Sequence, residues 1–155
     1  MSSMRSTFEN EIEKYGYLVY TNVGNSMMPL IRNGKDILVI TKKKESRLKK
    51  YDIVLYKRDN GQYVLHRILK VRRKDYILCG DNRCKKEKGV TDKQIIGILE
   101  KIIKDDIVIN VHNRKYILFL HIWCDLFFIR IIIIRLSRGI RRTKRVLKYY
   151  AKRFQ

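Results

Sequence analysis

The apolar residues of the first sixteen positions recur with helical spacing. They lie four and three residues apart: Phe8, Ile12 and Tyr15. Ser6 and Glu9 have the spacing of a capping box, and Gly16 suits a helix end. Residues 1–16 therefore predict one short amphipathic helix, and they lack the continuous apolar core of a signal peptide.

From residue 17 to residue 111 the pattern changes to short apolar runs that are typical of strands. The runs are 17–23, 36–40, 52–56, 63–71, 76–79, 95–103 and 106–111. Turn-forming sequences separate neighbouring runs, among them Asn33-Gly34 and Asp59-Asn60-Gly61, and these favour tight strand reversals. Six or seven short strands with such turns predict a mainly β domain with antiparallel pairing over residues 17–111.

Residues 112–155 return to a helical pattern. Of the 21 residues from 116 to 136, 17 are apolar or aromatic. After this segment, mostly apolar residues recur at steps of four and three with Arg and Lys between them: Leu136, Ile140, Thr143, Leu147, Tyr150 and Phe154. We expect an apolar helix followed by a basic amphipathic helix.

The apolar segment leaves two arrangements open. It is long enough to cross a bilayer, but Asp125 and Arg130 would each oppose insertion by roughly 2.5–3.5 kcal/mol at mid-depth. Its Leu, Ile and Phe residues favour insertion by a similar total, so the sum is close to zero. Because a basic tail follows, we expect helices that lie on the domain, on the bilayer interface or on a partner, with a single membrane crossing as the alternative.

The distribution of charge supports the same division of the chain. The 155 residues include 36 Lys and Arg against 15 Asp and Glu, a net charge of +21. Residues 112–155 hold 12 basic and one acidic side chain, about half of that excess. A hydrophobic content of 45% excludes a disordered polycation. The three cysteines favour neither a disulfide-stapled domain nor a zinc site, and we expect no metal and no cofactor.

Three short stretches of the β region carry candidate chemistry. The first, at the exit of a predicted strand, is Gly24-Asn25-Ser26-Met27-Met28-Pro29. A loop of this kind can expose a hydroxyl and aim backbone N–H groups at a carbonyl oxygen. His66 is the only histidine of residues 17–111, and Gly80-Asp81-Asn82 follows another predicted strand.

Read together, these stretches resemble the signal peptidase I family of serine endopeptidases, which share their fold with self-cleaving repressors. Five boxes occur in the family's order over roughly residues 18–100: Ser26-Met27-Met28-Pro29, Gly34-Lys35-Asp36, Tyr51-Asp52-Ile53-Val54, His66-Arg67 and Gly80-Asp81-Asn82. The resemblance implies a signal-peptidase-like antiparallel β domain. A histidine directly before the arginine is similar to the variant of the family that uses His, rather than Lys, as general base.

The resemblance also implies the roles of individual residues. Ser26 would be the nucleophile, His66 its general base and Asp81 the acidic partner of the histidine. A serine hydroxyl needs such a base, and an imidazole with a pKa near 6.5 requires little tuning. An aspartate on the far ring nitrogen would fix the tautomer and stabilise the imidazolium.

We expect the oxyanion site and the substrate groove beside the nucleophile. The backbone N–H of Ser26 is the expected oxyanion donor, and Gly24 stands where some family members place a second serine. Asn25, Met27 and Met28 complete the residues that we expect there, the two methionines as an apolar lining.

The predicted function is cleavage of a leader or signal-type peptide. The expected partners are a peptide or preprotein substrate and an anionic membrane surface, bound through residues 116–155, so the expected location is the cytoplasm or the cytoplasmic membrane face. The alternative is a basic protein with an inactive peptidase fold that binds nucleic acid or a membrane surface. The short, acidic segment 1–16 does not suit a helix-turn-helix, so nucleic acid is the less favoured partner.

Overall fold

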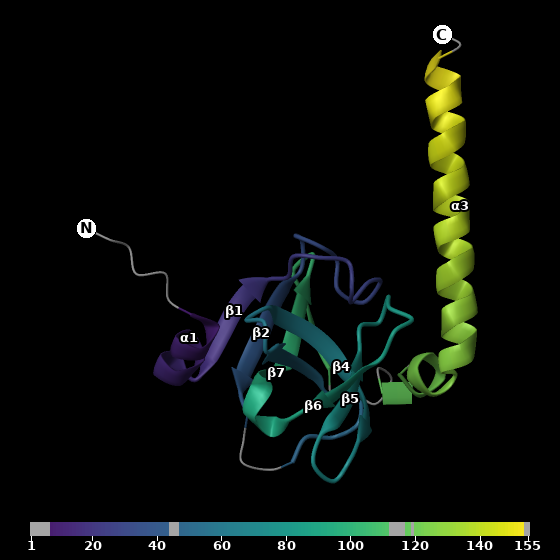
Figure 1. The fold of residues 1–155 in the computed structure, drawn as a ribbon. Coiled ribbons are helices and arrows are strands. Elements are labelled where there is room, and N and C mark those ends of the chain that lie inside the picture. The colour runs from purple at the N-terminus through teal and green to yellow at the C-terminus, as the bar shows by residue number, and fades with distance from the viewer. Residues whose placement is uncertain (1–6, 44–46, 112–116, 119, 154–155) are drawn as a thin grey trace.

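A computed structural model describes residues 7–43, 47–111, 117–118 and 120–153 (Figure 1). The strands are β1 (Tyr17–Thr21), β2 (Ile37–Lys42), β3 (Ile53–Lys57), β4 (Tyr63–Val71), β5 (Tyr76–Cys79), β6 (Glu87–Val90), β7 (Ile95–Lys104) and β8 (Ile107–Asn110). The helices are α1 (Phe8–Tyr15), η1 (Asp92–Gln94), η2 (His121–Asp125) and α3 (Phe127–Arg153). The mainly β fold with a short first helix and a C-terminal helix is therefore confirmed.

All strand pairs are antiparallel and form one sheet. Its order is β1-β2-β7-β3-β4-β5-β6, and β8 pairs with β7. Long β7 lies in the middle, where it pairs with both β2 and β3. This arrangement joins the strands around the Ser26 loop to those around His66, because β1 and β2 hold the first and β3, β4 and β5 surround the second.

Helix α1 covers one end of the sheet. Its N-cap is Thr7, whose hydroxyl accepts from the Asn10 amide, whereas the predicted cap Ser6 lies outside the described residues. Gly16 ends the helix in the left-handed conformation, as predicted. Ile12 is buried against the sheet, and Gly97 of β7 makes room for it: a Cβ there would lie 3.0 Å from the Ile12 side chain.

Alternate residues of the central strands enter two separate cores. In β3, Ile53 and Leu55 belong to the core that also contains Ile12. Val54 and Tyr56 point to the other face and belong to the second core. Because β3 is buried on both faces, it reads in the sequence as a continuous apolar run.

The C-terminal region differs from its prediction in where the helix breaks. The apolar segment 116–136 is divided near Leu126, whose ψ of 48° lies outside the helical range, between the π-helical turn η2 and α3. Helix α3 then continues through residue 136 without interruption and projects from the β domain (Figure 1). In the part of the chain that the structure covers, no helix is both long enough and apolar enough to cross a membrane. Residues 112–116, 119 and 154–155 of the predicted C-terminal segment lie outside the described ranges.

Candidate active site

Buried residues that follow Ser26 in the sequence fix the loop that carries it. Met27 and Ile31 are fully buried in the first core. Asp36, also fully buried, accepts hydrogen bonds from both the backbone and the side chain of Arg32, each at 2.7 Å. With these anchors the loop keeps its shape while Ser26 stays partly exposed.

Ser26 lies at a cleft of about 640 Å³, together with Gly24 and Asn25. The prediction that Met27 lines this groove is wrong, because its side chain is the apolar anchor of the loop and has no exposed surface. Met28 is half-buried and is not among the cleft residues. Among the described residues, neither the amide of Asn25 nor that of Ser26 donates a hydrogen bond, so both remain available to a substrate oxygen.

The rim of the cleft is basic. Arg83, Lys85 and Lys86 are exposed and line it on the side of the loop between β5 and β6. The acidic residue Glu87 also lines the cleft, but it is paired with the guanidinium of Arg58, which donates two hydrogen bonds to it at 2.8 and 2.6 Å. The rim therefore carries an excess of positive charge that an acidic ligand could neutralise.

His66 lies in β4 with only 6% of its surface exposed. Its Nδ1 lies 3.2 Å from the Tyr56 hydroxyl, and that hydroxyl donates to Glu87 Oε2 at 2.7 Å. Since the one proton of the hydroxyl is used by Glu87, Tyr56 accepts from an Nδ1–H of the histidine. This assignment leaves Nε2 unprotonated, with its lone pair free to act as a base.

Burial lowers the pKa of His66 to about 4, and the positive charge of Arg58 acts in the same direction. The negative charge of Glu87 opposes this shift. The hydrogen bond from Arg58 in turn holds the pKa of Glu87 below its ordinary value, so that carboxylate is ionised. His66 is therefore neutral at physiological pH and lies next to an anion that can stabilise its protonated form.

Gly80 brings the Ser26 loop and His66 together. A Cβ at this glycine would lie 2.6 Å from the carbonyl oxygen of Ser26 and 2.9 Å from Nε2 of His66. The two groups therefore face the same small space. Asn82, two residues further on, ties the turn to the loop, because its backbone N–H donates to the Ser26 carbonyl at 2.7 Å. Within the described residues no hydrogen bond joins the Ser26 hydroxyl to His66; such contacts often tighten only when substrate binds.

Asp81 occupies a different place from the predicted one. Both of its oxygens accept from Arg67, at 2.9 and 2.7 Å, and both side chains are almost fully buried. Because His66 and Arg67 are adjacent in β4, they point to opposite faces of the strand, and Asp81 lies on the arginine side. At the far ring nitrogen of His66 the acidic group is Glu87, 3.8 Å away and bridged by Tyr56.

Sequence reasoning missed Tyr56, Arg58 and Glu87. The register of the β3–β4 hairpin pairs Val54 with His66, so Tyr56 is the diagonal neighbour of the histidine on the same face. That register could have been read from the Asp59-Asn60-Gly61 turn. Glu87 begins β6, a strand with little apolar content, and no pattern in the sequence points to it.

Over the described ranges, no three His, Cys, Asp or Glu side chains cluster so that they could hold a metal ion. The comparisons add no identification: no protein-family model matches the chain, and neither does any curated protein or solved structure. The likeness to signal peptidase I rests on the sequence boxes alone.

Proposed function

We propose that this protein is a serine endopeptidase in which Ser26 is the nucleophile and His66 the general base. One observation carries the proposal, the two-sided environment of His66. Its Nδ1 is held by Tyr56 and Glu87. Its Nε2 faces the Ser26 loop across Gly80. The resemblance to signal peptidase I supplies the substrate class, a leader or signal-type peptide.

In the acylation step, Ser26 Oγ forms a bond to the scissile carbonyl carbon while its proton passes to His66 Nε2. We assign the N–H groups of Asn25 and Ser26 to the oxygen that gains negative charge. The C–N bond then breaks, and the leaving amine takes the proton from His66. An acyl-enzyme and a neutral imidazole remain.

In the deacylation step, His66 removes a proton from water as the water oxygen bonds to the acyl carbon. The bond to Ser26 Oγ then breaks, and Oγ recovers the proton from His66. In both steps Glu87 stabilises the imidazolium through its negative charge, and Tyr56 keeps the ring in the productive tautomer. Asp81 acts as a positioning residue, because it fixes Arg67 and with it the strand that carries His66.

The charge around the cleft limits the class of peptide that suits it as a substrate. The cationic rim of Arg83, Lys85 and Lys86 suits a peptide with acidic residues near the scissile bond. The proposal locates the protein in the cytoplasm or at the cytoplasmic face of the membrane, where a leader peptide would meet it.

The test is cleavage of peptides that carry small residues before the scissile bond, in pairs with acidic or basic flanks. An organophosphorus serine trap should label the wild type, and cleavage should favour the acidic flank. Ser26→Ala should abolish labelling and cleavage. His66→Ala should lower kcat by about 10²–10⁴-fold, the usual contribution of a general base.

Matched controls come from α3 and η2. Ser137→Ala and His121→Ala remove the same side chains at sites outside the cleft and should leave the rate unchanged. Cleavage that survives Ser26→Ala and His66→Ala would refute the site. A protein that neither cleaves nor reacts with the trap, yet binds nucleic acid or vesicles, would favour the alternative of a binding protein on an inactive peptidase fold.

A further inference from the structure

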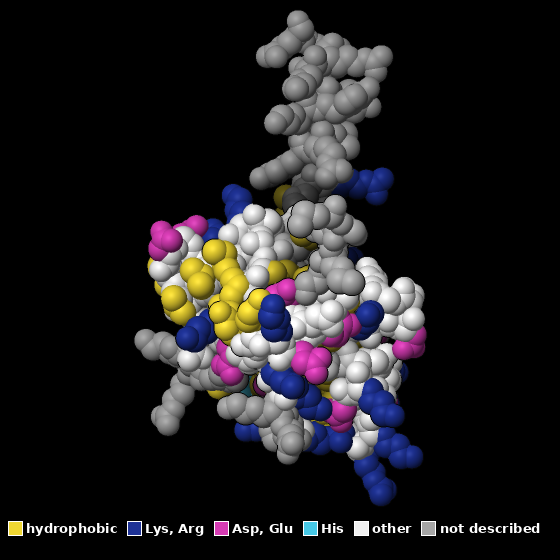
Figure 2. All heavy atoms as spheres, turned by 90° about the vertical axis from the view of Figure 1, so that its left-hand side faces the viewer, with side chains coloured by type: hydrophobic (Ala, Val, Ile, Leu, Met, Phe, Trp, Pro, Cys, Tyr) yellow, Lys and Arg dark blue, Asp and Glu magenta, His cyan; other side chains and the backbone are white. Residues whose placement is uncertain are grey.

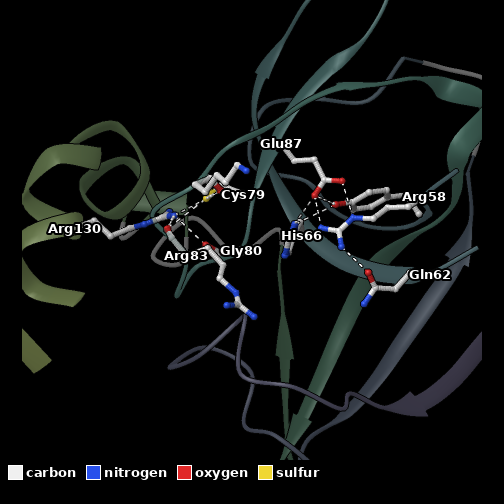
Figure 3. Close-up of polar contacts among 10 residues, drawn as sticks. Arg58, Gln62, His66, Cys79, Gly80, Arg83, Glu87 and Arg130 are labelled. Atoms are coloured by element: carbon white, nitrogen blue, oxygen red, sulfur yellow. Dashed lines mark hydrogen bonds and ion pairs between the residues drawn. The ribbon is translucent and has the colours of Figure 1, made fainter. Parts of the chain in front are cut away.

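Helix α3 has one face that is committed to the β domain. Arg130 and Ile134, one helical turn apart, are buried. Arg130 Nη2 donates to the carbonyl oxygens of Gly80 and Arg83, both at 2.9 Å, and to Cys79 Sγ at 3.1 Å (Figure 3). These contacts fix how the first half of α3 is rotated about its axis.

The opposite face of α3 is apolar and has no partner within the described structure. Its exposed residues are Phe128, Ile129, Ile132, Ile133, Leu136 and Ile140. Steps of three and four place them on one side of the helix, away from Arg130 and Ile134. Phe128 is 75% exposed and Leu136 is 62% exposed, so this face remains in water unless something covers it.

The charge of the same helix limits what can cover that face. From Arg135 onward the sequence contains nine Lys and Arg and no Asp or Glu. A second copy of α3 packed on the apolar face would bring two such basic stretches together, at an electrostatic cost. A nucleic acid would neutralise the charge but would leave the apolar side chains in water.

We propose that α3 binds the surface of a membrane that contains anionic phospholipids. The helix would lie in the plane of the interface, with Phe128, Ile132 and Leu136 at the boundary between headgroups and acyl chains. Its Lys and Arg side chains would face the lipid phosphates, as expected for a basic amphipathic helix. A lipid interface satisfies both the exposed apolar face and the excess of positive charge.

The experiment is co-sedimentation of the full chain with two kinds of vesicle, phosphatidylcholine alone and phosphatidylcholine mixed with phosphatidylglycerol. We expect binding to the anionic vesicles to be stronger by about tenfold or more and to weaken as salt rises. The double variant Ile132→Asp/Leu136→Asp should abolish it. The matched control is Ile107→Asp/Val108→Asp on β8, which adds the same charge at two exposed apolar positions and should retain most of the binding.

Circular dichroism and the midpoint of urea denaturation test whether each variant is folded, independently of its binding and of any peptidase activity. Equal binding to both vesicles, or anionic binding that survives Ile132→Asp/Leu136→Asp in a folded protein, would overturn the proposal. Absence of vesicle binding would overturn it as well. In that case, salt-sensitive binding to duplex DNA would assign the basic helix to nucleic acid, and a concentration-dependent dimer would assign the apolar face to a second copy. The proposal does not depend on peptidase activity.

Discussion

The surroundings of His66 and the exposed apolar face of α3 differ in whether the described protein supplies contacts for their side chains. Around His66 and Arg67, buried polar groups find their partners inside the protein: Asp81 for Arg67, and Tyr56 with Glu87 for His66. On α3, exposed apolar side chains have no cover among the described residues. The first region can define a chemical environment alone, whereas the second exposes apolar surface that the described residues do not cover.

A second apolar area lies on the side of the domain shown in Figure 2, where apolar side chains gather beside Lys and Arg. The exposed large apolar residues of α1, β1 and the start of β2 are Tyr15, Tyr17, Val19 and Ile37. Within the described sheet β1 is an edge strand, so no other strand pairs with its outer side. This area lacks the dense, acid-free run of basic residues that accompanies α3, so the two surfaces differ in their charge.

The largest expected effect is on the buried ion pair of the first region. Arg67→Met leaves Asp81 as an uncompensated buried charge, which should lower the free energy of unfolding by about 3–5 kcal/mol. Urea denaturation followed by circular dichroism measures this. Arg67→Met/Asp81→Leu should recover much of the loss, because replacing both partners leaves no unpaired charge. The exposed Arg73→Met is the matched control, and an equal loss in both single variants would contradict the account.

The next effect concerns the space between Ser26 and His66. In Gly80→Ala the new methyl group would meet the Ser26 carbonyl and His66 Nε2, so one of them must shift. A displacement of that size should lower kcat/KM by about 10²-fold. Gly139→Ala on α3 is the control, since nothing lies near its Cβ and the activity should not change. A Gly80→Ala protein with wild-type kcat/KM would show that the two groups do not act together.

The strands around Ser26 and His66 were largely predictable from the sequence. The residues that surround His66 in the folded protein, such as Glu87, were not. Strands β4 and β5 occupy the predicted ranges 63–71 and 76–79, because their apolar runs end at clear turn signals. Strand β6 was missed, since Glu87, Lys88 and Gly89 interrupt any apolar pattern. The local sequence shows the apolar pattern of a strand, but it does not show which strands pair with one another.

The same limit explains the candidate site. Ser26 and His66 stand in short recognisable boxes, so they could be proposed from the sequence. The group at the far nitrogen of His66 depends on how β5 pairs with β4 and β6 pairs with β5, which no local motif specifies. Likewise, whether Met27 faces the core or the groove depends on how the Ser26 loop folds onto the sheet.

A smaller effect separates the roles of Glu87 and Asp81. The activity requires neutral His66, whose pKa is about 4, so kcat/KM should be constant from neutral pH down to about pH 4 and fall below it. Glu87 raises the pKa of His66, so Glu87→Gln should move this acid limb to lower pH. It should also lower the plateau by about tenfold, because the imidazolium loses its anion.

The pH–rate profile of Glu87→Gln tests the role of Glu87. Glu13→Gln on the exposed side of α1 is the matched control and should leave both the limb and the plateau unchanged. A limb that stays in place after Glu87→Gln would mean that Glu87 does not act on His66. That result would refute the role that we assign to Glu87.

The smallest expected effect lies where the two regions meet, at Arg130. The side chain of Arg130 extends from α3 to the turn at residues 80–83, where its Nη2 donates two hydrogen bonds. Its Nε and Nη1 have no hydrogen-bond partner among the described residues. A buried guanidinium without full pairing contributes little to stability, so Arg130→Met should change the free energy of unfolding by less than about 1 kcal/mol. The turn would lose the bonds to Gly80 and Arg83, so kcat should fall by about threefold to tenfold with little change in KM.

Arg135 is an exposed arginine on the same helix. Comparison with Arg135→Met distinguishes the effect of losing the Arg130 contacts from the effect of losing one positive charge. That control removes the same positive charge without touching the turn, so its kcat should equal that of the wild type. If Arg130→Met lost stability and activity in proportion, the arginine would be an ordinary structural anchor of α3. A fall in kcat at constant stability would instead mean that α3 holds the turn beside Ser26 and His66. The helix whose apolar face is exposed among the described residues would then be coupled to the site around His66.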